Sequence, residues 1–434
     1  MSGAAQAAAA TGAQAIQLSK YPQVNPLLLS FLNNMVGVVN SVSDRGGVPW
    51  YVWIIMAIIL ILLMRYTISL YWIIETPPNI RCALNTFLDK FNKYGDNRSN
   101  RTGLRDYISQ LKAKGLPDAN LALTNFYVSS CNSPAIFTPL RDGIASPDAL
   151  RLCFAQGARY IDLCIWSDVK SNNYRPMIKG MDVGSNWRRI TMTEMSFKTA
   201  MDNVVKYGMA GPNADSDTNS APYRDDPLFI MLRFKGKHHN QTFTEVANIL
   251  RSTIEHNRLD FTYNKGRSME SLFRVPITEF FNKVVIMSDT YPPEGNLLFD
   301  YINVAPRSGV EQTISSRDLS YIPNENQPQL QAKIKQNLTV SRTELEEPTS
   351  DTNSNDWTIA HAYGVHFAAM NFWSEDEKLA SYFAPDNFGK SSFKLKPTAM
   401  QYVIQYIAPP LLPNPALNAR DGKPREPPAI ISPF

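Results

Sequence analysis

Two uninterrupted apolar runs constrain the fold of this 434-residue chain more than any other feature. The run PLFIMLRF spans residues 227–234, and the run KVVIMSD spans residues 283–289. Neither run alternates apolar with polar residues, so each predicts a strand that is buried on both faces. Strands of this kind belong to parallel sheets whose faces are covered by helices.

Helix signals alternate with such strands along the chain. Ser146 and Pro147 form a serine N-cap followed by proline at the first helical position, which predicts a helix to about Gln156. About eight strands over about 290 residues, separated by helices, predict an α/β fold of the TIM-type (β/α)8 barrel class. We expect polar loops at residues 315–335 and 343–357. The other expected helices are Glu194–Tyr207 and Thr242–Glu255, and the other expected strands are Leu121–Ser129, 158–166, Pro176–Met181 and short runs from Tyr301, Leu338 and Val365.

An apolar segment precedes this region. Residues 48–64 are uncharged and apolar, and the run continues past Arg65 to Ile74. A helix needs about 20 residues to cross a bilayer, so we expect a single transmembrane helix over residues 48–75. Lysine and arginine are more frequent after this segment than before it, which predicts a single-pass protein with its C-terminal part on the cytoplasmic side. Residues 24–43 could form an amphipathic helix that lies in the membrane interface, or a buried helix.

Composition excludes some classes of function. The formal net charge is +4 and no basic stripe carries interleaved aromatic residues, so we expect no nucleic-acid partner. The four cysteines contain no C-x-x-C pair, so neither a zinc ribbon nor a redox motif is indicated.

Several segments follow one another in the order of a known family. They include NFYVSSCNSPA (Asn125–Ala135), ALRLCFAQGARYIDLCIWSD (149–168), PMIKG (176–180), DPLFIMLRF (226–234) and GVHFAAMNFW (364–373). Together they resemble the catalytic barrel of phosphoinositide-specific phospholipase C, roughly over residues 118–400. The resemblance implies a TIM-type barrel made of an X and a Y half. It also implies hydrolysis of a phosphodiester by two histidines and a calcium ion.

The hydropathy pattern, the composition and the resemblance together divide the chain into seven segments. The expected segments are an N-terminal arm with the amphipathic helix (1–47), the transmembrane helix (48–75), a juxtamembrane connector (76–117), the X-like half (118–290), a linker and strand (291–335), the Y-like half (336–407) and a proline-rich tail (408–434).

The residues that should carry the chemistry are replaced. A guanidinium repels calcium and a thiol is a soft ligand, so we expect that the calcium site is lost and that no cofactor binds. Neither lysine nor a thiol takes the role of histidine near neutral pH without a large pKa shift. By the resemblance, Cys131 and Lys179 stand for the two histidines, Asn132 is kept, and Asp162, Cys164 and Arg233 stand for the family's remaining carboxylates.

Two interpretations of these residues stay open. Cys131 could be a nucleophile with His238 or His239 as its base, although a buried inert thiol is favoured. The cations at Lys179, Arg233 and Arg342 could bind a phosphate or a lipid headgroup. An internal ion pair between Arg233 and Asp162 is favoured over that binding site.

The leading hypothesis is a membrane-anchored pseudoenzyme that acts as a structural or interaction module with protein partners in a larger assembly. Its organisation also resembles a membrane-associated structural (minor capsid) protein of a large DNA virus, and therefore a virion component. The alternatives are a divergent phosphodiesterase active on phosphoinositides and a tether that binds phosphoinositides without cleaving them.

Overall fold

In the computed structural model the chain divides into two units, Met1–Asn79 and Ile80–Phe434. The described residues are 56–67, 101–137, 144–168, 174–180, 191, 193–209, 221–235, 240–260, 275–293, 295–305, 313–342, 355–373 and 376–402.

In the first unit, residues 56–67 form an α-helix within the expected membrane span. The rest of the 48–75 segment, the helix expected at 24–43 and the tail at 408–434 lie outside the described residues. Among the residues that the structure describes, no helix is both long enough and apolar enough to cross a membrane.

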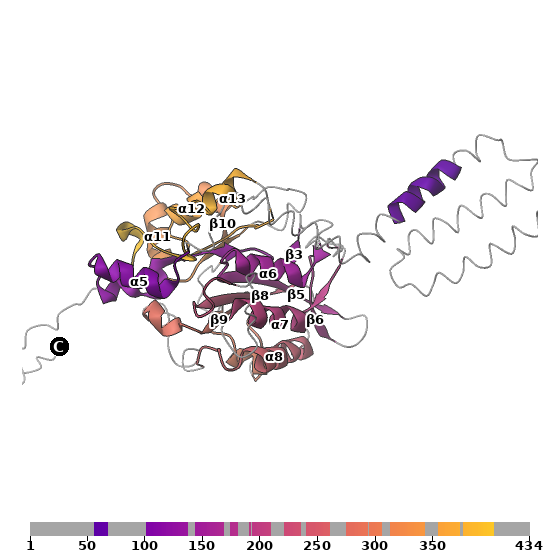
Figure 1. Cartoon of the computed structure of the whole chain (residues 1–434), viewed down its shortest axis with the longest axis horizontal. Helices are drawn as coiled ribbons and strands as arrows, with labels where there is room; N and C mark the ends of the chain where they lie inside the picture. The colour runs from indigo at the N-terminus through magenta and orange to yellow at the C-terminus, as the bar shows by residue number, and fades with distance from the viewer. Residues whose placement is uncertain are drawn as a thin grey trace, which may run out of the picture. The chain divides into compact units, whose positions relative to one another are not determined.

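Parallel strands dominate the second unit (Figure 1). Pairings run from β10 through β11 and β12 to β1, and from β2 through β5 and β8 to β9. Single parallel bridges link Cys131 to Met370 and Met287 to Val304. The strands are β1 (Phe126–Val128), β2 (Ser130–Cys131), β5 (Tyr160–Asp168), β8 (Leu228–Lys235), β9 (Val284–Ser288), β10 (Thr313–Ser315), β11 (Val340–Arg342) and β12 (Phe367–Ala369).

This order is the one expected for successive strands of a barrel, and it confirms an α/β fold with a largely parallel sheet. In the part of the chain that the structure describes, no pairing joins Val304 to β10. Closure of the barrel therefore stays a prediction.

Antiparallel strands were not expected. The segment 176–181 was predicted as the third strand of the series, but β6 (Arg175–Ile178) pairs antiparallel with the far end of β5. It forms an excursion with β7 (Met195–Ser196) beyond the parallel strands. A further strand, β13 (Phe393–Leu395), pairs antiparallel with β1, and β3 (Ile136–Phe137) pairs with β4 (Ile144–Ala145).

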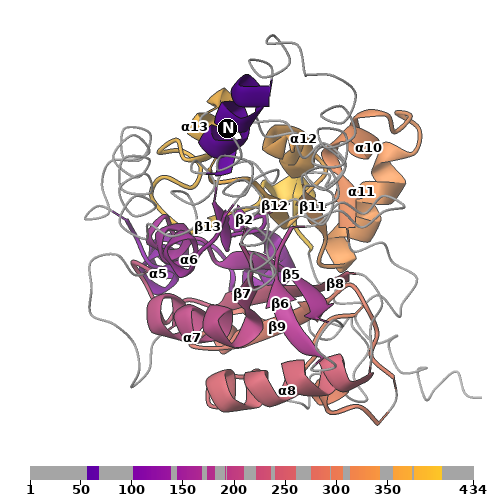
Figure 2. The ribbon, with the colours of Figure 1, turned by 90° about the vertical axis from the view of Figure 1, so that its right-hand side faces the viewer.

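The helices lie along the strands, with α6, α7 and α8 on one side and α10, α11 and α12 on another (Figure 2). As predicted, α6 begins after Ser146, whose side chain accepts a hydrogen bond from the Asp148 amide. The bounds are α5 (Leu104–Ala113), α6 (Pro147–Ala155), α7 (Phe197–Gly208), α8 (Asn240–Ile254), α10 (Ser316–Ser320), α11 (Gln327–Gln336), α12 (Trp357–Ala362) and α13 (Glu377–Tyr382).

The polar loop predicted at residues 315–335 was wrong, because α10 and α11 occupy it. The Ser315 side chain caps α10 by accepting from the Asp318 amide. In α11, glutamine and lysine favour a helix, but Ile334 is its one buried residue, so the apolar period is too weak to detect. Helix α5 lies in the segment expected as a connector, and it packs Leu104 and Ile108 into the core.

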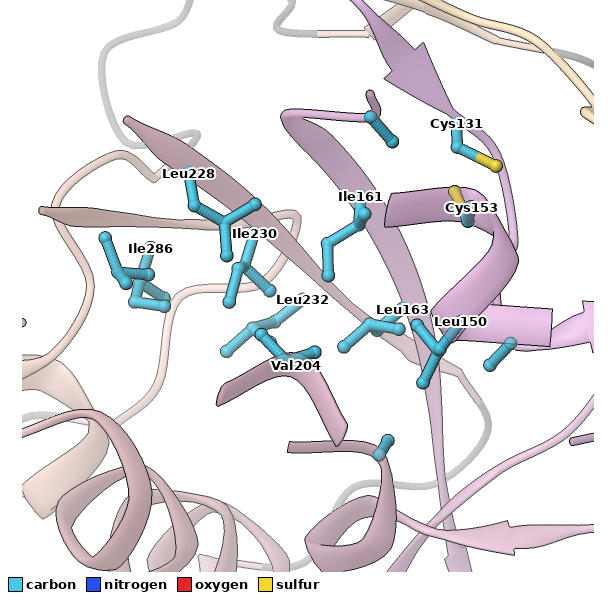
Figure 3. Packing of buried hydrophobic residues seen from close by; sticks show 14 of the residues in the cluster. Cys131, Leu150, Cys153, Ile161, Leu163, Val204, Leu228, Ile230, Leu232 and Ile286 are labelled. Atoms are coloured by element: carbon cyan, nitrogen blue, oxygen red, sulfur yellow. The ribbon is translucent and has the colours of Figure 1, made fainter. Parts of the chain in front are cut away.

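Alternate residues of β8, β9 and β12 enter two different cores. On β8, Phe229 and Met231 belong to an inner cluster, to which strands of both large sheets contribute. Ile230 and Leu232 belong to an outer cluster that packs against helices, beside Val204 of α7 (Figure 3). Because side chains of a strand alternate between its faces, each site residue can be assigned to the inner or the outer face.

Candidate functional site

A buried ion pair lies at the centre of the candidate site. Asp162 on β5 and Arg233 on β8 are on the inner face, and parallel pairing aligns Cys164 with Arg233. The Arg233 Nε donates to Asp162 Oδ2 at 2.5 Å, and the two side chains are 3% and 0% exposed. The structure thus forms the ion pair that the sequence favours.

Electrostatics hold Arg233 in its charged form. Burial opposes the charge, but the carboxylate and hydrogen bond of Asp162 outweigh it and raise the pKa of Arg233. Two further nitrogens of the guanidinium, Nη1 and Nη2, lie 3.4 and 3.5 Å from Thr313 Oγ1. The pair is therefore a fixed internal contact between three strands.

More cations gather around Cys164. Burial and the nearby Asp162 raise the pKa of this thiol, whereas the charges of Arg342, Arg233 and Lys235 lower it. Lys235 Nζ lies 3.4 Å from Asp289 Oδ2. Sequence reasoning missed Lys235, although its position two residues after Arg233 on β8 places it on the same strand face.

Lys179 lies apart from this group. It follows β6 directly, and its Nζ lies 3.3 Å from Oε2 of Glu194, which precedes β7. The two side chains are 16% and 39% exposed. The interactions of the described residues do not bring Lys179 together with Arg233.

Cys131 faces away from the site. Its side chain is fully buried in the outer cluster, where its sulfur lies beside that of Cys153 on α6 (Figure 3). Burial raises the pKa of Cys153, and the neighbouring Cys131 raises it further. His238 and His239 lie outside the described residues. This placement favours the buried, inert thiol.

The donor set does not fit calcium. The Asn132 amide donates to the Met370 carbonyl at 2.8 Å, and its Oδ1 lies 3.5 Å from Ser133 Oγ. The carboxylate of Asp162 is bonded to a guanidinium, and Cys164 offers only a soft thiol. Among the described residues, no three or more His, Cys, Asp or Glu side chains form a group that could hold a metal ion.

No protein-family model matches the sequence, and no curated protein matches it. Solved structures do match. PLC21 of S. officinalis aligns with a TM-score of 0.50 and 14% identity, over 65% of this chain and 38% of that one. PLC21 of L. pealei aligns with a TM-score of 0.49, also at 14% identity and over the same shares of the two chains. This chain thus spans well under half of either structure, and the likeness establishes a phospholipase C-like fold.

Proposed function

We propose that this protein is a membrane-anchored, catalytically inactive phospholipase C-like protein whose barrel acts as a structural or interaction module. The observation that carries the proposal is the ion pair between Arg233 and Asp162. Metal-assisted cleavage of a phosphodiester needs a hard cation held by free oxygen ligands. Here the Asp162 carboxylate is paired with the buried guanidinium of Arg233 instead.

Loss of the acid and base groups supports the same conclusion. A general acid or base must reach the reacting group and titrate near the working pH. Cys131 points into the outer cluster, and Lys179 is paired with Glu194. Neither residue offers what a catalytic histidine would supply.

The helix at residues 56–67 supports membrane anchoring through residues 48–75. Successive residues of a helix are about 100° apart, so the exposed apolar side chains surround this helix instead of forming one stripe. Over residues 56–64 the helix surface is apolar all round, which suits lipid better than a single protein groove, and the exposed Arg65 follows this stretch. We propose that the C-terminal part lies on the cytoplasmic side, as the charge bias predicts. The exposed side chains, between 52% and 62% exposed, are Ile58, Leu60, Ile61, Leu62, Met64 and Tyr66.

The proposal extends to protein partners in a larger assembly, such as the membrane-associated layer of a virion. A barrel without chemistry that is held at a bilayer offers its surface to partners. Co-purification of the protein with virion membranes after removal of the outer layer would support this part. Its absence from virions would contradict it.

The experiment for inactivity is hydrolysis of phosphatidylinositol vesicles by the full chain in detergent, with calcium and with a chelator. We expect no release of inositol phosphate in either condition, beside an active phospholipase C as positive control. Release that Cys131→Ala abolishes would favour the divergent enzyme over the pseudoenzyme. Release that Cys131→Ala leaves unchanged would also overturn inactivity, but would exclude the Cys131 mechanism.

A site that binds a phosphate without cleaving it is the second candidate. Three cations, Arg233, Lys235 and Arg342, lie close enough to Cys164 for their charges to lower the pKa of its thiol. Calorimetry with inositol phosphates separates headgroup binding from insertion of the anchor. We expect no saturable binding, since carboxylates already pair with Arg233 and Lys235. Saturable binding that Lys235→Met weakens and Lys179→Met does not would favour the tether.

A further inference from the structure

His366 connects three segments of backbone at the amino ends of neighbouring strands. It directly precedes β12 and is 1% exposed. Its Nδ1 lies 3.2 Å from the Thr339 amide nitrogen, just before β11. Its Nε2 lies 3.0 Å from the Thr124 carbonyl oxygen, just before β1.

These two contacts fix the protonation state of the ring. An amide N–H needs an acceptor, so Nδ1 must be unprotonated. A carbonyl needs a donor, so Nε2 must carry the proton. Protonation at Nδ1 would set two N–H groups against each other and break the contact with Thr339. The imidazolium therefore does not fit this position.

Two other buried bases lie near His366. Lys396 is 2% exposed, and its Nζ donates to the Gly364 carbonyl at 2.6 Å. The same Nζ lies 5.4 Å from the ring centroid of Tyr127. The His361 ring stacks on the same tyrosine, with the two ring centroids 3.9 Å apart. We call His361, His366 and Lys396 the basic cluster.

Within the described part of the chain, the groups that face the basic cluster are cations and neutral side chains. The charges of Lys394 and Lys396 lower the pKa of His361. The charge of Lys396 lowers the pKa of His366, and that of Lys335 lowers the pKa of Lys396. Tyr127, Trp357 and Phe388 pack on the His361 ring, and Phe367 packs on His366. Among the ion pairs of the described residues, none includes a member of the cluster. Among the described residues, no carboxylate is therefore in place to compensate an added proton.

Burial lowers the pKa of both histidines of the cluster. It lowers the pKa of His361 to about 3, and the charges of Lys394 and Lys396 add to the shift. It also lowers the pKa of His366 well below its usual range, with Lys396 adding and the Thr124 hydrogen bond opposing. Both rings are neutral in the folded protein at pH 7.

The junction that His366 connects is the one between the two halves of the fold. Val128 of β1 pairs with Phe367 of β12, which directly follows His366. We propose that protonation of His366, assisted by His361, is an acid-triggered switch that releases β12 from β1 and loosens the carboxyl-terminal half from the amino-terminal half. This device is independent of the proposed lack of catalysis.

Proton binding decides whether the protein gains or loses stability as the pH falls. The unfolded chain has histidine pKa values near 6.5, above those of the folded state, so unfolding takes up protons as the pH falls below about 6.5. Each histidine then lowers the folded-to-unfolded ratio about 25-fold between pH 7 and pH 5. Asp226 opposes this, because burial raises its pKa to about 6 and it gains a proton in the folded state. Its contribution is about tenfold, which is smaller than that of the two histidines together. Burial also lowers the pKa of Lys396, so this group also favours the unfolded state on acidification.

The test is urea unfolding of the full chain in detergent at pH 7 and pH 5. We compare wild type with His366→Gln, which offers an amide donor and acceptor but does not titrate. The control is His256→Gln, at an exposed position after α8. We expect His366→Gln to remove about 25-fold of the acid-induced loss, and His256→Gln to remove none. An unchanged loss in His366→Gln overturns the proposal.

A second measurement uses the wild-type protein, in case His366→Gln does not fold. Hydrogen exchange of the Thr339 amide is followed at pH 7 and pH 5 and corrected for the intrinsic rate. We expect its protection to fall at least tenfold at pH 5, while that of the Phe229 amide, bonded to the Arg159 carbonyl, falls less. Equal protection of Thr339 at both pH values contradicts the switch.

Discussion

Two buried polar groups of this protein meet the same physical problem in different ways. Asp162 and Arg233 form a buried ion pair, and each compensates the charge of the other. The basic cluster of His361, His366 and Lys396 has no carboxylate partner among the described residues, and its histidines are neutral. The stability that an ion pair contributes changes little with pH near neutrality, whereas acidification protonates a buried neutral base and breaks its contacts. The contact between Asp162 and Arg233 is therefore kept across the neutral range, and the contacts of the basic cluster depend on pH.

The largest effect is expected from breaking the ion pair on one side. Arg233→Met leaves the Asp162 carboxylate buried without a cation, which costs about 3–5 kcal/mol of unfolding free energy. The double variant Arg233→Met with Asp162→Leu should recover most of that loss. Urea unfolding at pH 7 measures both. A single variant that loses less than about 1 kcal/mol would show that the pair is not fully desolvated.

The second prediction sharpens the difference in pH dependence. Wild type should lose about 2 kcal/mol per titrating histidine between pH 7 and pH 5, before the opposing contribution of Asp226. The double variant at Arg233 and Asp162 should show the same loss, because its substitutions lie outside the basic cluster. Unfolding at a series of pH values measures the slope. A flatter slope in the double variant would assign the acid sensitivity to the ion pair.

A smaller effect is expected from the tyrosine beside the basic cluster. Tyr127→Phe removes the hydrogen bond from Tyr127 Oη to the His361 carbonyl, which is 2.6 Å long. The carbonyl keeps the Gly364 amide as a second donor, so we expect a loss of about 1 kcal/mol. Urea unfolding at pH 7 measures it. A loss above about 3 kcal/mol would mean that the ring stack itself depends on this bond.

The smallest effect is expected at Lys179. Its pairing with Glu194 is partly exposed to solvent, so Lys179→Ala should change the unfolding free energy by about 0–1 kcal/mol, and less in high salt. Unfolding at low and high salt measures it beside Arg233→Met. A loss as large as that of Arg233→Met would contradict the distinction between the two cations.

The long strands were predictable from the sequence, and the short ones only in part. The short strands β1, β11 and β12 lie within predicted runs. Strands β8 and β9 are continuous apolar runs, and they were predicted within a residue or two. Strands β10 and β13 have three residues each, too few to show a period. The direction of β6 is set by its pairing with the extended end of β5, and a local pattern does not contain that information.

The candidate site was predictable in part. The resemblance placed Asp162 and Arg233 at neighbouring positions of the site, which favoured their pairing, and in the structure they lie on the same face of adjacent strands. The buried, inert thiol favoured for Cys131 agrees with its place in the outer cluster, but the sequence did not show which face of β2 it lies on. His366 gave no signal, because a histidine in an apolar run reveals its partners only when distant backbone segments are placed beside it.

Ser129, between β1 and β2, has a consequence for the order of folding during synthesis. Its amide donates to the Ser392 carbonyl, and its carbonyl accepts from the amides of Arg159 and Tyr160. The partners on one side leave the ribosome soon after Ser129, and the partner on the other side only near the end of the chain. Domains fold as their residues emerge, so β2, β5, β8 and β9 can pair first. Strand β1 stays unpaired until its partner strands β12 and β13 are synthesised. During translation, the nascent chain must keep the open edge of β1 from other strands until β12 and β13 arrive.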